Sequence, residues 1–151
     1  MNIESSLLKS YFPVDYYDSF ERSVSGKRAI TPEELLHLIF SEFPWWVDML
    51  MRVRNVLVKP FGLKNDGFEE HLSDMVQCRS ERETIIGMND KHLAFYVSLW
   101  CSSEEQDSQI VGVTTIVKYN NWLGRIYFFF IRPFHKLIIK NLLNNVSRLK
   151  L

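Results

Sequence analysis

The sequence predicts an α+β fold in which a curved antiparallel sheet wraps around one long C-terminal helix. From residue 122 onward, apolar residues recur at three- and four-residue steps, which is the spacing of one face of a helix. Between residues 74 and 119 the apolar period changes to two and the connections are short, as in antiparallel strands. The chain has 151 residues and no internal repeat, so we expect one domain with its own core.

A first strand is expected near the N-terminus. Residues 1–13 show no clear period and are predicted to be a loosely held lead-in. In residues 14–24 larger side chains alternate with Ser and Glu, and Ser25-Gly26-Lys27 then marks a turn. The alternation places the first strand within residues 14–24.

A short helix should follow, because Thr31, Pro32 and Glu34 form a pattern that starts helices. Thr31 can cap the helix, proline suits the first helical position, and Glu34 can reach back to the cap. The helix is expected to stop before Pro44, since a residue that precedes proline avoids the helical region.

Pro44 can also open a second short helix. Trp45, Trp46 and Met49 hold the helical period, and residues 59–62, with the sequence Lys-Pro-Phe-Gly, end it. Two consecutive short helices are therefore predicted between the first strand and the rest of the sheet.

Four further strands are expected after a polar loop. In the clearest one the odd-numbered residues from Leu93 to Cys101 face one way, and the even-numbered residues from His92 to Trp100 face the other. Short polar segments connect the strands as hairpins, which favours antiparallel pairing. The predicted strands are residues 74–79, 83–88, 92–101 and 109–119.

The final helix is expected to turn one apolar face to the sheet and a basic face to solvent. Pro133 removes one backbone donor and should kink this helix without ending it. The basic side carries Arg125, Arg132, Lys136 and Lys140. The predicted sheet-facing residues are Leu123, Ile126, Tyr127, Phe130, Phe134, Leu137 and Ile138.

The formal net charge of zero hides an uneven distribution along the chain. The last acidic residue is Asp107, and residues 108–151 carry seven Lys and Arg side chains. One interpretation is a basic surface for an anionic partner, and the other is a basic helix that packs beside an acidic remainder. Because the whole chain is neutral and carries no nucleic-acid-binding motif, we expect no nucleic-acid partner.

Several other classes are excluded by residue type and spacing. Cys78 and Cys101 lie in no CxxC pair and give no disulfide framework, which predicts a cytoplasmic location. The N-terminal residues do not resemble a signal peptide, and charges interrupt the apolar run near residues 126–143. No spacing of His, Cys, Asp and Glu is typical of a metal site, so neither a metal nor another cofactor is expected.

Two segments resemble an uncharacterised bacterial family that is known as a domain of unknown function. Ile86-Gly87-Met88-Asn89-Asp90-Lys91-His92-Leu93-Ala94-Phe95 is similar to its "DKHLxF" pattern. Leu123-Gly124-Arg125-Ile126-Tyr127, followed by Pro133-Phe134-His135, is similar to its "GRxY…PFH" pattern. The resemblance covers roughly residues 11–148. The order of the elements also resembles the helix-grip superfamily, which contains START lipid-transfer domains and polyketide cyclases.

The helix-grip resemblance implies a hydrophobic cavity between the sheet and the final helix. We therefore predict binding of a small hydrophobic or amphipathic molecule, with Arg125 and His135 at its polar group. In the alternative, the same aromatic residues fill the core and Arg125 pairs with an acidic residue. The predicted lining residues are Trp45, Trp46, Met49, Tyr96, Trp100, Tyr127 and Phe130.

Two other functions remain as alternatives to ligand binding. An enzyme of the polyketide-cyclase type would use His92 or His135 as an acid or base, because histidine transfers protons near neutral pH. A protein that docks on a membrane surface or a partner would use the basic, aromatic final helix. That use requires Phe128, Phe129, Ile139 and Leu143 to be exposed together. The chain is expected to be a monomer or a homodimer.

Overall fold

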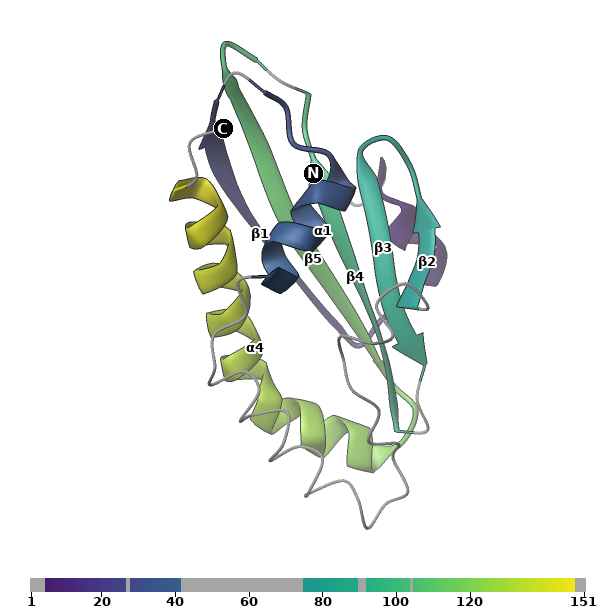
Figure 1. Ribbon diagram of the computed structural model, residues 1–151. Coiled ribbons are helices and arrows are strands. Elements are labelled where there is room, and N and C mark those ends of the chain that lie inside the picture. The colour runs from purple at the N-terminus through teal and green to yellow at the C-terminus, as the bar shows by residue number, and fades with distance from the viewer. Residues whose placement is uncertain (1–4, 27, 42–74, 90–91, 104, 149–151) are drawn as a thin grey trace.

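The computed structural model is an α+β fold with one antiparallel sheet, a short helix after the first strand and a long C-terminal helix (Figure 1). It describes residues 5–26, 28–41, 75–89, 92–103 and 105–148. The helices are a 3-10 turn η2 (Leu7–Tyr11), α1 (Pro32–Ser41) and α4 (Trp122–Arg148). The strands are β1 (Tyr16–Ser25), β2 (Val76–Arg79), β3 (Glu83–Asn89), β4 (Leu93–Cys101) and β5 (Ser108–Tyr119).

The sheet confirms the predicted antiparallel strands. Its order is β1-β5-β4-β3-β2, so the first strand pairs with the last and the others follow as hairpins. In the β1–β5 pair, Asp18 lies opposite Thr115, and in the β4–β5 pair Trp100 lies opposite Gly112. Because successive side chains alternate between the faces of a strand, this register decides which residues can meet.

The start of α1 confirms the predicted capping box. The backbone N–H of Glu34 donates to the Thr31 hydroxyl at 3.2 Å, and the Thr31 N–H donates to the Glu34 carboxylate at 3.5 Å. The helix ends at Ser41 among the described residues. The second predicted helix, with Trp45, Trp46 and Met49, lies outside the described residues.

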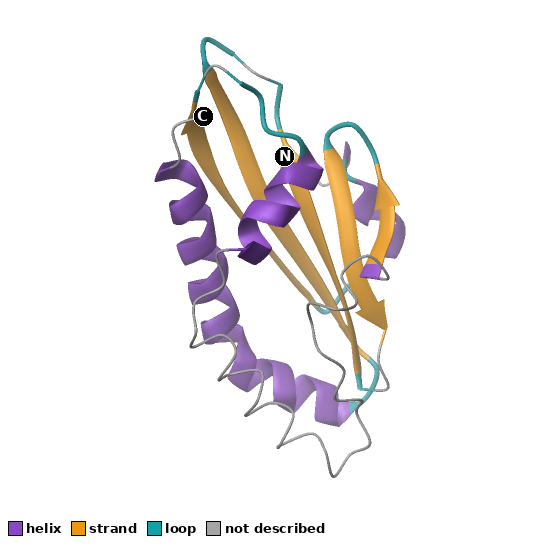
Figure 2. Ribbon diagram, viewed as in Figure 1, coloured by secondary structure: helices purple, strands orange, loops and turns teal. Residues whose placement is uncertain are grey.

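Different elements pack on the two faces of the sheet (Figure 2). We call the side with α1 and α4 the α4 face, and the side with η2 the N-terminal face. The core of the α4 face joins strand residues to both helices through Leu35, Val113 and Leu142. The core of the N-terminal face is smaller and is built on Leu8, Ile85 and Ile116.

The sequence predicts that residues 1–13 are loosely held, but the described part of this segment packs against the sheet. Leu8 is fully buried, and Ser6 caps η2 by accepting the Leu8 N–H. The Glu83 carboxylate accepts the Ser6 hydroxyl at 2.5 Å and the Leu7 N–H at 2.9 Å. This docking could not be predicted from local patterns, because the buried carboxylate that holds the segment is far away along the chain.

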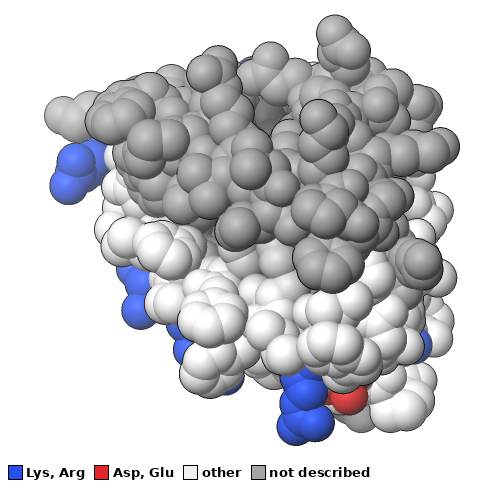
Figure 3. Space-filling model, turned by 90° about the horizontal axis from the view of Figure 1, so that it is seen from below, with Lys and Arg blue, Asp and Glu red and all other residues white. Residues whose placement is uncertain are grey.

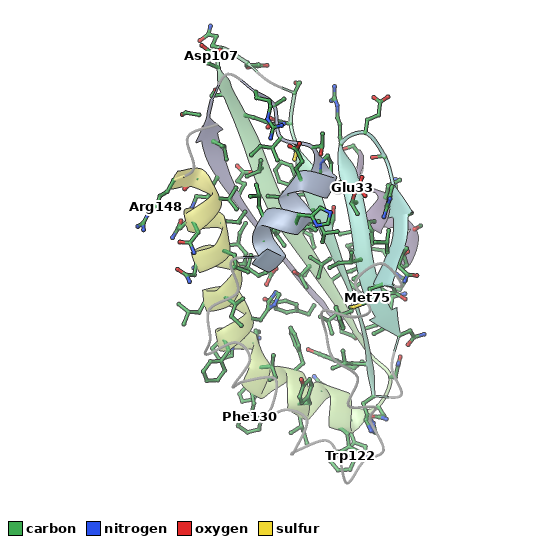
Figure 4. The ribbon with its side chains drawn as sticks, viewed as in Figure 1. Glu33, Met75, Asp107, Trp122, Phe130 and Arg148 are labelled. Atoms are coloured by element: carbon green, nitrogen blue, oxygen red, sulfur yellow. The ribbon has the colours of Figure 1, made fainter. Side chains whose placement is uncertain are left out.

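Helix α4 has the predicted length and contains Pro133, but the predicted orientation of its apolar face is wrong. Of the residues expected to face the sheet, Ile126, Phe130, Phe134 and Leu137 are exposed. Figure 4 shows the labelled Phe130 side chain pointing away from the sheet. The residues that α4 buries are Gly124, Phe128, Leu142, Leu143 and Val146.

The contact between Gly124 and the start of β4 explains this orientation. A Cβ atom on Gly124 would lie 1.9 Å from the carbonyl oxygen of His92, so only glycine fits against this backbone. The Asn121 side chain accepts the Gly124 N–H at 3.1 Å and also bonds to the His92 ring. Apolar residues surround most of the first half of α4, so their spacing alone cannot select the side that packs.

Within the part of the chain that the structure describes, no helix is long and apolar enough to span a membrane.

Candidate functional site between the sheet and the C-terminal helix

Three polar side chains from different elements are buried on the α4 face. Asp18 comes from β1, Thr115 lies opposite it on β5, and His135 reaches towards Asp18 from α4. The side chains of His135 and Asp18 are 17% and 8% exposed, and Thr115 is 2% exposed. Buried polar groups normally have hydrogen-bond partners, so the bonding of each atom here is informative.

In the part of the chain that the structure describes, only one oxygen of the Asp18 carboxylate accepts a hydrogen bond. Its Oδ2 atom accepts the Tyr16 hydroxyl at 2.5 Å and lies 3.4 Å from His135 Nε2. The His135 contact has ion-pair distance without the direction of a hydrogen bond. Asp18 Oδ1, Thr115 Oγ1 and His135 Nε2 therefore have no hydrogen-bond partner among the described residues.

Aromatic rings stand around this polar cluster. Phe128 meets the Tyr16 ring edge-on, with 4.7 Å between the centroids, and lies 6.4 Å from the His135 ring. Burial, followed by the hydrogen bond to Asp18 and its negative charge, raises the pKa of Tyr16. Tyr16 consequently stays protonated and keeps donating to Asp18 across the neutral pH range.

The hydrogen-bonding atoms of this cluster suit a polar group. Among the described residues, no group of three or more His, Cys, Asp and Glu side chains is placed to hold a metal ion. The atoms without partners are a carboxylate oxygen, a hydroxyl and an imidazole nitrogen. Together they can accept a hydrogen bond from a ligand and donate one to it, which suits a hydroxyl, an amine or an amide.

Of the predicted ligand-binding residues on α4, only His135 belongs to this cluster. Arg125 is exposed, Phe130 is 67% exposed, and Tyr127 is partly buried. The structure therefore does not bring Arg125 and His135 together around one polar group. Trp45, Trp46 and Met49 lie outside the described residues, so their role stays a prediction.

Tyr96 and Trp100 lie on the N-terminal face, away from α4. Tyr96 stacks on Tyr11, with 4.0 Å between the ring centroids. A Cβ atom on Gly87 would come 2.3 Å from the Tyr96 ring, and one on Gly112 would come 2.2 Å from the Trp100 ring. Each ring covers the glycine directly opposite it on the neighbouring strand, so neither can share a sheet–helix site with His135.

His92 holds the start of α4 in place. Its ring is buried and bonds through Nδ1 to the Asn121 side chain, and its carbonyl oxygen accepts the Asn120 N–H at 2.9 Å. This agrees with a structural role at the start of a strand. Of the two histidines considered for acid–base chemistry, only His135 lies beside a carboxylate among the described residues.

Sequence reasoning missed Asp18, Tyr16 and Thr115. The period of two in β1 puts Tyr16 and Asp18 on the same side as Phe20, which packs in the core of the α4 face. A carboxylate at an inward-facing position was the available signal. Its partner Thr115 could be found only once the β1–β5 register was known.

The fold and the cluster define a class: an α+β protein with a buried polar cluster between its sheet and its long terminal helix. The chain belongs to the family described as "Protein of unknown function (DUF2867)", which it matches over residues 12–142. No curated protein and no solved structure matches the chain.

Proposed function

We propose that this protein binds a small amphipathic molecule between the sheet and α4. The observation that carries the proposal is the set of three buried polar atoms on Asp18, Thr115 and His135 that lack partners among the described residues. Leaving such atoms unpaired costs about 1–3 kcal/mol each, so a bound polar group would offset that cost.

The atoms of the cluster favour a ligand whose polar end donates a hydrogen bond. Asp18 supplies a carboxylate, and the exposed side chain of Arg125 does not balance it. An amine or a hydroxyl can donate to Asp18 Oδ1, whereas a carboxylate would meet a like charge. The apolar part of the ligand would lie against rings such as Phe128, which already surround the cluster.

The resemblance to the helix-grip superfamily supports the same location, because the cavity it implies also lies between sheet and terminal helix. A resemblance in fold is a weak argument for function on its own. The unpaired atoms add a chemical reason that is independent of it, and they select the polar end of the ligand.

Native mass spectrometry of the purified protein tests the proposal directly. We expect an added mass that disappears on denaturation, or one that appears after incubation with long-chain amines and alcohols. Long-chain fatty acids should be retained less. A bare mass under all of these conditions would contradict ligand binding.

The matched variants are Thr115→Val and Thr114→Val, since these neighbours point to opposite faces of the sheet. Thr115→Val removes one of the unpaired atoms and should abolish retention of the ligand. Thr114→Val changes the N-terminal face, where the hydroxyl bonds to Trp100 and Ser19, and should leave retention unchanged. Equal loss in both variants would place the ligand elsewhere.

Acid–base chemistry on the bound molecule is the second candidate function. It is favoured by the 3.4 Å approach of His135 to Asp18, because a carboxylate can orient a histidine that accepts a proton. The test is whether the retained mass changes with time in the native protein but not in His135→Gln. A ligand whose mass never changes would leave binding as the function.

A further inference from the structure

The side of α4 that points away from the sheet is an unusually apolar surface. We call it the outer face of α4. Its six large apolar side chains are between 47% and 68% exposed, and they recur at helical steps. Scattered exposed apolar residues are normal, but a continuous stripe of this kind marks an interaction surface. The stripe consists of Trp122, Ile126, Phe129, Phe130, Phe134 and Leu137.

Basic side chains border this stripe. The Arg132 guanidinium lies over the Phe129 ring, 5.9 Å from its centroid, and Phe129 meets Phe130 edge-on at 5.6 Å. An open hollow of about 510 Å³ is lined by phenylalanines together with Arg132 and Lys136. In the view of Figure 3, Lys and Arg gather along the left and lower edges of the uncharged described surface.

The charge of α4 indicates which kind of partner can bind to this surface. From Trp122 to Arg148 the helix carries five Lys and Arg residues and no Asp or Glu. If a second copy packed its own α4 against this stripe, basic residues would face basic residues, which is unfavourable. An anionic surface has the complementary charge and can also accept the aromatic side chains.

We propose that the outer face of α4 docks on an anionic phospholipid membrane surface. A helix with aromatic residues on one side and Lys and Arg beside them lies in the plane of the lipid headgroups. Each nearby basic residue adds attraction to anionic lipid, and the effect weakens with salt. The proposal does not depend on the ligand site, because none of its residues belongs to the Asp18 cluster.

The set of side chains that the sequence predicts for membrane docking differs from this stripe. Phe128 and Leu143 are buried, so the set formed by these two with Phe129 and Ile139 is not exposed together. The docking surface inferred here is rotated on the helix and contains residues that were expected to face the sheet. The exposure of Phe130 and Phe134 is therefore the observation on which it stands.

Vesicle co-sedimentation of the full chain tests the proposal. One set of vesicles is phosphatidylcholine alone, and the other contains about one third phosphatidylglycerol. We expect binding at least about tenfold stronger to the anionic set, and loss of that preference when the ionic strength rises from about 0.05 M to about 0.5 M.

Two double variants separate the apolar and the basic contributions. Phe130→Ser with Phe134→Ser removes exposed rings, and Arg125→Glu with Lys136→Glu reverses exposed charges. Each should weaken binding to anionic vesicles by about tenfold or more. Arg132 is left unchanged because its charge also acts on Tyr16.

The controls place the same kinds of change elsewhere on the surface. Ile110→Ser alters an apolar residue of β5 that is 42% exposed, and Arg82→Glu reverses an exposed charge near the start of β3. Both should bind like the parent chain, and circular dichroism should show every variant folded.

Three results would overturn the proposal. The first is no binding to either set of vesicles, and the second is equal binding to both sets, since charge would then play no part. The third is a stable dimer, seen by sedimentation velocity without lipid, that Phe130→Ser with Phe134→Ser dissociates. That result would assign the outer face of α4 to a contact between copies of the chain.

Discussion

On the N-terminal face the buried carboxylate of Glu83 accepts three hydrogen bonds, whereas on the α4 face the buried carboxylate of Asp18 has one oxygen without a partner among the described residues. Two of the Glu83 donors come from Ser6 and Leu7 of the N-terminal segment, and the third is Ser98 of the sheet. Glu83 thus ties a segment to the sheet. Asp18 belongs to a cluster whose bonding capacity is only partly used.

The carboxylates of Glu83 and Asp18 thus show that a buried polar group can serve two different purposes on one sheet. A fully bonded buried carboxylate fixes a local structure, because its desolvation is offset by charge-assisted hydrogen bonds. A partly bonded one is stable only where surrounding structure tolerates the cost, and it is available to a ligand. We therefore expect substitutions on the N-terminal face to change stability, and substitutions at the Asp18 cluster to change binding.

The largest effect is expected from Gly124→Ala. In an exposed helix this change stabilises by about 1 kcal/mol, but here the new Cβ would meet the His92 carbonyl oxygen. Because backbone cannot move aside cheaply, we expect the free energy of unfolding to fall by about 3 kcal/mol, measured by urea denaturation.

Gly112→Ala is the matched comparison on the other face. Its Cβ would meet the Trp100 ring, which can shift more easily than backbone, so a loss of about 2 kcal/mol is expected. A neutral or stabilising Gly124→Ala would show that α4 is not anchored at His92, and the orientation of the helix would then need revision.

The elements of the fold could be predicted where the signal is local. The capping box at Thr31 and Glu34 and the alternation in β4 both depend on neighbours in the sequence, and both were predicted correctly. The orientation of α4 depends on which side Gly124 presents to a distant carbonyl. No count of apolar residues reveals that contact.

The same distinction applies to the candidate site. His135 was singled out because histidine has useful chemistry at neutral pH, but its partner Asp18 is distant in the sequence and becomes visible only in the folded chain. The sequence predicts Tyr96 and Trp100 as cavity residues, but in the structure each ring covers a glycine on the adjacent strand. Cross-strand register decided their role.

Glu83→Gln should weaken the attachment of the N-terminal segment to the sheet and leave the packing of the α4 face unchanged. The amide replaces one acceptor oxygen with a donor, so we expect the free energy of unfolding to fall by about 2 kcal/mol. A thiol reagent should react faster with Cys78, which packs beneath the N-terminal segment, and at an unchanged rate with Cys101 in the opposite core.

Glu81→Gln is the control for this experiment, because Glu81 is exposed only two residues away. It should change neither stability nor thiol reactivity. If both thiols react faster in Glu83→Gln, the variant opens the whole domain rather than one face, and the bonds of Glu83 are not a local tie.

The Cys101 thiol, which lies in the core of the α4 face, should make the stability of the protein depend on pH. Burial, with a smaller effect from the charge of Glu34, raises the pKa of its thiol from 9.0 to about 12. The protonated thiol is therefore favoured by folding. This stabilisation is complete below pH 9 and is lost as the pH rises towards 12.

The measurement compares urea denaturation of the parent and Cys101→Ala at neutral pH and near pH 10.5. The parent should lose about 2 kcal/mol more than the variant over this interval, since one pKa unit corresponds to about 1.4 kcal/mol. Tyrosines also titrate in this range, but they are common to both proteins. Parallel pH profiles would mean that the thiol is reached by solvent.

The smallest effects give the sharpest test of the contrast, because Thr114 and Thr115 are adjacent, equally buried and oriented to opposite faces. The Thr114 hydroxyl accepts the Trp100 indole N–H at 3.1 Å and bonds to the Ser19 hydroxyl at 2.8 Å. Thr114→Val leaves both groups without this partner, and we expect a loss of about 1–2 kcal/mol.

Thr115→Val removes a buried hydroxyl that has no partner among the described residues, at almost constant side-chain shape. The ligand-free protein should gain up to about 1 kcal/mol, measured by urea denaturation under the same conditions. Opposite signs at two neighbouring threonines would show that the buried Thr114 hydroxyl contributes to folding and that the Thr115 hydroxyl of the Asp18 cluster does not. A loss of similar size at Thr115 would mean that its hydroxyl is already satisfied in the folded protein, and the Asp18 cluster would then have less capacity for a ligand.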